Sequence, residues 1–438
     1  MALSFSAGIH RREMLRFGSV AGLSMAELFR LQHASGAEQA GKKEINCIFI
    51  FILGGMSHHD LWDLKPDAPD EIRGDFDPIS TNVPGIQISE ILPQISKVTD
   101  KLGILRGMTH TDADHGRGTH TMMTGVKPGA GDFNVGRDNN QHPSLGSMVA
   151  KMSQADSSLP SYISVPTFLR SGGANFLGAS CDPFVIESDP AAPEFSVRDI
   201  SLPANVALDR SRRRQAALQQ INQLESGAER ASKGVKSLDV FYQKAYNLMT
   251  SVKAKEAFDI HRESDTTRQR YGMTSIGQCC LLARRIVEAG GRFVTVEDGN
   301  WDTHRKNTMS LRQLLVPAFD QAIPALLGDL SERGLLDSTL VVISTEFGRT
   351  PRINVLAGRD HWPQAFTICM AGAELKTGQV IGQTDKQGAY VMDRPITPQD
   401  FTATILSRLG IDPNTVLYTE GGRPIQLVAG GKPVKELI

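Results

Sequence analysis

A continuous apolar run constrains the fold more than any other feature of the sequence. Residues 45–53 read INCIFIFIL, and Gly54-Gly55 follows at once. A strand with one solvated face would alternate apolar and polar residues, whereas this run is apolar at nearly every position. The sequence therefore predicts a strand buried on both faces, which is typical of a parallel sheet with helices on each side.

Strand-like and helix-like segments alternate along the rest of the chain. Helices that separate buried strands favour an α/β fold with a central, mostly parallel sheet covered on both faces. We expect further strands at 102–106, 162–165, 292–296, 339–344 and 366–370, and helices at 89–101, from about 116, 277–289, 311–333 and 397–409.

The 438 residues divide into a leader and one large domain. Residues 10–16, HRREMLR, resemble a twin-arginine export motif, and an apolar stretch and small residues follow. We expect residues 1–40 to be the signal, with an ordinary amphipathic helix as the alternative, and export to the periplasm or beyond. Residues 41–438 form the predicted single domain. Residues 157–205 are loop-like, and about 206–270 are charged and helical, which predicts a helical insertion.

Composition excludes some classes of protein. The 47 Lys and Arg against 48 Asp and Glu give a net charge of -1, so we expect no nucleic-acid partner. No stretch is apolar over the ~18 residues of a membrane span, and none is predicted. The five cysteines form no CxxC pair, which argues against a structural zinc cluster. The oligomeric state stays open.

Histidine and carboxylate side chains follow several predicted strands. Ligands of open α/β sheets bind beyond the carboxyl ends of the strands, so these side chains are expected to meet there. One such histidine alone is more often a hydrogen-bonded structural residue, but both residue types at several strand ends predict a divalent metal site. The clusters are His58, His59, Asp60 and Asp63; His110, Asp112, Asp114, His115 and His120; Glu297, Asp298, Asp302 and His304; and Glu346, Arg349, Arg359, Asp360 and His361.

These same segments carry a family resemblance. In order they are GGMSHHDLWDLKP, ILRGMTH, DH with TMMTG, WDTH, LLDSTLVVISTEFGRTP and GRDHWP. From about residue 45 to 428 the chain resembles the exported proteins grouped as domain of unknown function 1501, which look related to the alkaline phosphatase and sulfatase superfamily. The resemblance implies an alkaline phosphatase/sulfatase-like fold.

The resemblance also implies roles for individual residues. The superfamily nucleophile lies ten residues before the Gly of a Thr-Gly pair, and here that position, relative to Gly125, is His115. His115 therefore stands where a serine, threonine or modified cysteine is usual. A neutral imidazole can ligate a metal, act as a base or attack phosphorus, and we expect a ligand or a base.

Six residues are expected as metal ligands. Asp302, five residues after Glu297, and His304 resemble the Asp and His of one metal position, and His361 resembles the late histidine of that site. Glu346 offers an oxygen where the superfamily has Asp, although Phe347 replaces the following His. Gly54 replaces the usual Asp after the first strand, and His58 and Asp60 are expected to compensate. Zinc, manganese, calcium and magnesium stay open as the metal.

Two functions compete at this stage. The first is a metal-dependent hydrolase of phosphate or sulfate esters, in which His115 is the base or a ligand. Arg117 and Arg349, and also Arg359, would then clamp a small anionic ester or a sulfated or phosphorylated glycan. The second is a non-catalytic exported protein that keeps the fold to bind a metal, an anionic glycan or a partner.

Overall fold

The fold is known from a computed structural model of the chain. It describes residues 44–129, 142–153, 158–198, 200, 213, 248–419 and 421–438. The predicted signal at residues 1–40 lies outside the described residues and stays a prediction. The residues described within Ile45–Ile438 belong to one compact unit.

An eight-stranded sheet forms the centre of this unit, with the strand order β12-β4-β11-β8-β1-β7-β5-β6. The apolar run forms β1 (Asn46–Ile52), which pairs in parallel with β7 (Phe293–Asp298) and β8 (Thr339–Thr345). All pairs in this sheet are parallel except those of β11 (Phe366–Gly372), which runs antiparallel to β4 (Gly103–Met108) and β8. The predicted mostly parallel α/β sheet is confirmed.

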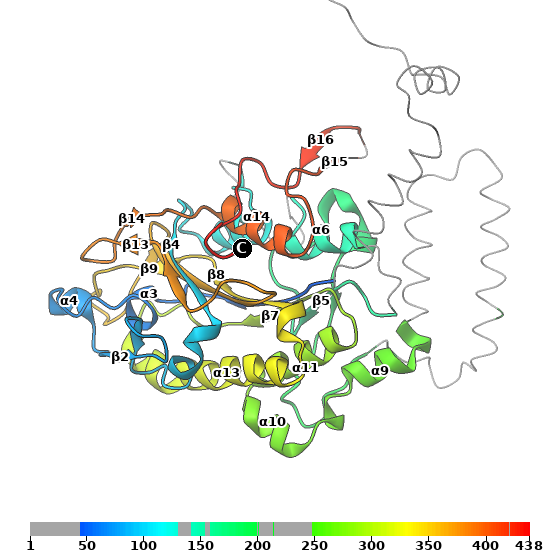
Figure 1. Cartoon of the computed structure of the whole chain (residues 1–438), viewed down its shortest axis with the longest axis horizontal. Coiled ribbons are helices and arrows are strands. Elements are labelled where there is room, and N and C mark those ends of the chain that lie inside the picture. Colours follow the sequence, from blue (N-terminus) through cyan, green and yellow to red (C-terminus); the bar gives the residue numbers. More distant parts are fainter. Residues whose placement is uncertain are drawn as a thin grey trace, which may run out of the picture. The chain divides into compact units, whose positions relative to one another are not determined.

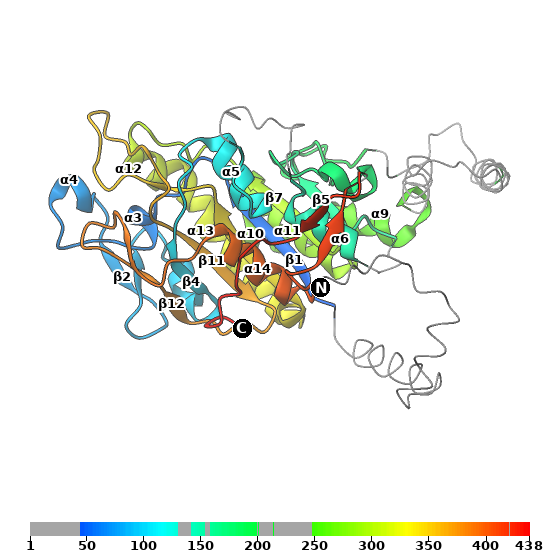
Figure 2. The same cartoon turned by 90° about the horizontal axis from the view of Figure 1, so that it is seen from above.

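Helices cover both faces of the sheet because β1 is apolar on both. Ile48, Ile50 and Ile52 belong to the core shared with α11 (Ser275–Glu288) and α13 (Val316–Glu332), whereas Phe49 and Phe51 belong to the opposite core. That second core packs α6 (Leu145–Met152) and α14 (Pro398–Arg408). Figure 1 shows α11 and α13 below the sheet and α6 and α14 above it. Figure 2, seen from above, shows α5 (His115–Thr124) with α6 and α14.

Shorter elements complete the described chain. They are α3 (His58–Leu61), α4 (Asp70–Arg73), β2 (Pro78–Ser80), β3 (Gln87–Ser89), η1 (Ile95–Lys101), β5 (Tyr162–Val165), η2 (Asn175–Leu177), η3 (Ala179–Cys181), β6 (Phe184–Val185), α9 (Val252–Phe258), η4 (Ile260–Arg262), α10 (Asp265–Tyr271), α12 (Asn307–Ser310), η5 (Leu311–Leu315), η6 (Leu336–Ser338), β9 (Gly348–Arg349), β10 (His361–Trp362), β12 (Gln379–Ile381), β13 (Gln383–Thr384), β14 (Val391–Asp393), β15 (Val416–Tyr418) and β16 (Pro424–Gln426).

Three local predictions need correction. The helix expected at 89–101 is only the 3-10 segment Ile95–Lys101, because Ser89 ends strand β3 and Pro93 precedes the helix. The helix expected at 311–333 begins earlier, at α12, and passes through a π-helical turn before α13. Besides the expected strand at 162–165, which is β5, the loop-like stretch at 157–205 contains β6, a two-residue strand too short for a periodic signal.

Apart from residue 213, the predicted insertion is described only at its C-terminal end, residues 248–270. There, α9, η4 and α10 are helical as expected, and the greater part of 206–270 lies outside the described residues. Where the structure describes the chain, no helix has the length and apolar character of a membrane span.

Candidate metal centre

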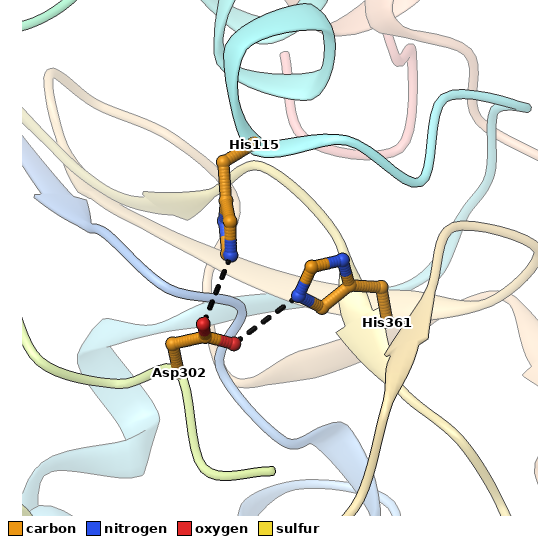
Figure 3. A group of neighbouring side chains, drawn as sticks. All are labelled: His115, Asp302 and His361. Atoms are coloured by element: carbon orange, nitrogen blue, oxygen red, sulfur yellow. Dashed lines mark hydrogen bonds and ion pairs between the residues drawn. The ribbon is translucent and has the colours of Figure 1, made fainter.

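Three side chains from distant parts of the sequence meet beyond the carboxyl ends of the central strands. His115 is the first residue of α5, Asp302 follows β7, and His361 lies in β10. One ligand atom from each of the three lies within 4.8 Å of the others, which makes them the one potential metal-binding group among the residues described. Figure 3 shows both imidazole rings directed at the Asp302 carboxylate.

Two carboxylates flank the His115 ring. Nδ1 donates to Glu346 Oε1 at 2.6 Å, and Nε2 lies 3.3 Å from Asp302 Oδ2. Burial of the ring favours its neutral form, but the hydrogen bond to Glu346 and the charges of Glu346 and Asp302 outweigh burial and raise the pKa of His115. Nε2 is shielded from solvent, and it faces the Asp302 carboxylate.

Asp302 is the anion at the centre of the group. Its Oδ1 atom accepts a 2.5 Å hydrogen bond from Arg349 Nη2 and lies 3.0 Å from His304 Nε2 and 3.1 Å from His361 Nε2. Partial burial opposes ionisation, but the bond and charge of Arg349, with His361 and His115, lower the pKa of Asp302 to about 2. Asp302 is therefore ionised at neutral pH.

Each histidine of the cluster has an acceptor on its Nδ1 atom. His115 Nδ1 faces Glu346 Oε1 at 2.6 Å, His304 Nδ1 faces Asp360 Oδ1 at 2.5 Å, and His361 Nδ1 faces the Ala113 carbonyl at 2.6 Å. Carboxylate and carbonyl oxygens only accept, so the ring proton resides on Nδ1 in all three. The Nε2 atoms are then left to face Asp302.

This arrangement fits a cation. His304 Nε2 and His361 Nε2 lie 2.9 Å apart, and both lie near the Asp302 carboxylate. With protons on Nδ1, two acceptor nitrogens and a carboxylate oxygen would repel one another at these distances unless a proton or a metal ion lay between them. Burial and the charges of His115 and Arg349 lower the pKa of His361, which disfavours the extra proton there.

The arginines predicted to clamp an anion are engaged elsewhere. Arg349 is fully buried, and its donors reach Asp302 and the carbonyls of Gly54, Gly55, Trp301 and Arg359. Arg359 is likewise buried against Asp60 and nearby carbonyls. Arg117 bonds Asp112 and the carbonyls of Pro128 and Gly129. In this structure they hold loops together.

Two predicted ligands belong to a different network. Asp60 accepts from Ser57, Asn307 and Arg359, and His58 Nε2 donates to the Gly388 carbonyl at 2.9 Å. Neither joins His115, Asp302 and His361. Burial lowers the pKa of His58, so this histidine is neutral. The expectation that both compensate for Gly54 gains no support from their positions.

Sequence reasoning placed Asp360 among the residues after the strands but gave it no individual role. It adjoins His361 in GRDHWP, but a carboxylate that bonds a histidine far away in the sequence leaves no local signal.

The carboxyl group of Glu297 has a perturbed pKa: burial, with the charges of Glu346 and Asp298, raises it to about 7. Perturbed carboxyl groups of this kind gather at functional sites.

Comparison with known proteins gives one family and several distant structures. The family described as "Protein of unknown function (DUF1501)" matches residues 44–438. No curated protein is significantly similar to the chain.

The solved structures that resemble the chain share little sequence with it. The lipoteichoic acid synthase LtaP from Listeria monocytogenes is 10% identical, with a TM-score of 0.38 over 89% of this chain and 76% of that one. The PsFucS1 sulfatase from Pseudoalteromonas sp. is 13% identical, with a TM-score of 0.36 over 89% and 72%. The phosphonate monoester hydrolase SpPMH from Silicibacter pomeroyi is 14% identical, with a TM-score of 0.35 over 90% and 76%. With TM-scores this low, these proteins supply no functional inference for this chain.

Proposed function

The chain belongs to the DUF1501 family of proteins of unknown function, and from this premise we propose that it is an exported, metal-dependent hydrolase of phosphate or sulfate esters. One observation carries the proposal: imidazole Nε2 atoms converge on one ionised carboxylate while their Nδ1 atoms are bound from behind. Metal-ligating histidines have this environment, in which an acceptor on one nitrogen orients the other toward the ion.

His115, Asp302 and His361 would hold the ion, with His304 as a further donor beside them. A site with histidine nitrogen and carboxylate oxygen donors suits zinc or manganese. Calcium and magnesium prefer sites whose ligands are all oxygen atoms. A divalent cation bound there would neutralise charge on an anionic ester and lower the pKa of water.

The chain's own residues would position the substrate. Arg170, on the loop after β5, and Arg305, beside His304, are exposed and form no hydrogen bond or ion pair with any described residue. Their planar guanidinium groups can pair with a phosphate or sulfate. The loop that carries Arg170 is fixed to α5, because Ser171 Oγ lies 3.3 Å from His120 Nδ1.

The test measures metal content and ester hydrolysis in the same protein samples. Chelator-treated protein is titrated with Zn²⁺, Mn²⁺, Ca²⁺ and Mg²⁺, and each form is assayed with chromogenic phosphate and sulfate esters. We expect one tightly bound ion and measurable hydrolysis, both lost in His115→Ala and His361→Ala. His261→Ala is the matched control, because His261 bonds the Phe195 carbonyl outside the cluster. A wild-type protein that binds no metal would refute the proposal.

A non-catalytic binding protein is the second candidate. Phe347 packs its ring 5.1 Å from that of His115 and 4.5 Å from that of His361, so an apolar side chain stands where the superfamily resemblance expects a histidine ligand. Metal binding without hydrolysis across the panel would favour this alternative.

Export is proposed from the motif alone. Replacing Arg11 and Arg12 with Lys should retain the protein in the cytoplasm if the twin-arginine route carries it. Cell fractionation checks this, and normal export of the double variant would contradict it.

A further inference from the structure

Two carboxylates lie behind the histidines of the metal centre. Glu346 contacts the Nδ1 side of His115, and Asp360 contacts the Nδ1 side of His304. The two imidazole nitrogens point in divergent directions, so an acceptor on Nδ1 fixes which way Nε2 points. Each carboxylate therefore acts on the centre from the far side of a ring.

The contacts of Glu346 leave it little freedom. Oε1 accepts from His115 Nδ1 at 2.6 Å and from the Gly54 backbone N–H at 2.8 Å, and Oε2 accepts from Thr345 Oγ1 at 3.1 Å. The side chain is fully buried. Both oxygens are thus engaged on the Nδ1 side of His115. Neither Glu346 nor His304 belongs to the three residues whose ligand atoms converge, but His304 Nε2 lies 3.0 Å from Asp302 Oδ1.

Asp360 reaches His304 from the loop before β10. Its Oδ1 atom lies 2.5 Å from His304 Nδ1 and accepts from Asn354 Nδ2 at 3.3 Å. Asn354 Nδ2 also donates to the His304 carbonyl at 3.1 Å, so the same pair fixes both the ring and the backbone of His304. The Asp360 side chain is 52% exposed, which makes it open to substitution without a buried defect.

We propose that Glu346 and Asp360 are positioning residues that aim the Nε2 atoms of His115 and His304 at a shared metal ion without ligating it. The proposal rests on the metal centre proposed above. It replaces the expectation that Glu346 is itself a ligand, and it gives Asp360 a role. Loss of such an orienting partner typically weakens metal binding about 10- to 100-fold.

The test compares metal affinity across paired variants of the full chain. Zn²⁺ dissociation constants are measured by competition with a chromogenic chelator. We expect Asp360→Ala to weaken binding about 10- to 100-fold and Asp360→Asn to weaken it less, because the amide oxygen still accepts from Nδ1–H. Glu346→Ala and Glu346→Gln should show the same order. Asp337→Ala, an exposed carboxylate in η6, is the control and should bind as the wild type does.

Double variants separate positioning from ligation. If Asp360 acts only through His304, adding Asp360→Ala to His304→Ala should change the dissociation constant no further. A further loss in that background would show that Asp360 contacts the ion and would overturn the inference. Wild-type affinity in Asp360→Ala would also overturn it. Absence of metal binding in the wild type would instead refute the proposed function. Should Glu346→Ala fail to fold by circular dichroism, the Asp360 series alone decides.

Discussion

Arg349 shows how the same residue type can be read in two ways. In sequence it is an arginine near a strand end, which suits an anion clamp. In the structure its guanidinium is fully buried and joins the turns at Gly54-Gly55 and Trp301-Asp302. The planar fork of arginine can serve several acceptors at once, which a lysine ammonium at the end of a flexible stem cannot do.

Arg349→Lys is therefore expected to destabilise the protein strongly. The substitution leaves several buried carbonyls without donors, and each unsatisfied buried acceptor typically costs about 1–3 kcal/mol. Urea unfolding measures the difference. Arg352→Lys, an exposed arginine on the same segment, is the matched control and should be nearly neutral. Equal stability of the two variants would contradict this role for Arg349.

Glu297 should make stability depend on pH. Its folded pKa of about 7 lies above the ordinary 4.5, so the unfolded chain loses the proton first as pH rises. Stability attributable to this group falls between those two values and levels off above them. Glu297→Gln removes that slope and should gain about 1–3 kcal/mol over the wild type at about pH 8. The test measures the free energy of unfolding by urea, without metal, at about pH 5 and pH 8, for Glu297→Gln and for the exposed control Glu194→Gln. The same pH dependence in both variants would refute the prediction.

Among the elements, the end of β1 and the turn after β7 approach most closely at a glycine. Gly54 has φ +125, and a Cβ placed there would lie 2.6 Å from the Trp301 carbonyl carbon and close to the Asp302 backbone nitrogen. The Gly54 N–H also donates to Glu346, which binds His115. A side chain at position 54 would therefore push apart the turns that carry the metal centre.

Gly54→Ala should cost about 3–5 kcal/mol, as backbone strain and overpacking combine, and should weaken metal binding. Gly85→Ala separates the two effects, because Gly85 has φ +84 but no atom within 4 Å of the added Cβ. We expect that control to lose only about 1–2 kcal/mol, and to bind metal normally. Thermal unfolding with metal titration measures both. Similar losses in the two variants would show that the close approach is unimportant.

For the whole molecule, a bound ion would join α5, the turn after β7 and the β9–β10 ribbon. A ligand that binds only the folded state stabilises it by about 2.7 kcal/mol at a free concentration near 100 times its Kd. Zn²⁺ should therefore raise the unfolding temperature, and a chelator should reverse the rise. His115→Ala with His361→Ala should abolish the shift, whereas His261→Ala should retain it. A shift of wild-type size in the double variant would place the ion elsewhere.

The sequence by itself determined the layered sheet. Hydrophobic periodicity, segment length and the glycines at segment ends are local signals. They predicted strand β1 and helices α11 and α14 close to their observed positions. The motifs and their order predicted, by resemblance, the family that the chain matches over residues 44–438. The resemblance grouped Asp302, His304 and His361 in one predicted site, and in the structure the Nε2 atoms of both histidines lie near the Asp302 carboxylate.

Only the tertiary structure decided what each polar side chain faces. Nothing local distinguishes Arg349, whose donors are consumed by carbonyls, from Arg170, which stays exposed. Likewise, Glu346 and Asp302 both lie at strand ends, yet Glu346 contacts Nδ1 of His115 and Asp302 faces Nε2 of the same ring. Hydrophobic burial is set by residue type and periodicity along the chain, whereas hydrogen bonding and ion pairing are set by angles and distances of a few ångströms between segments that only the packed fold brings together.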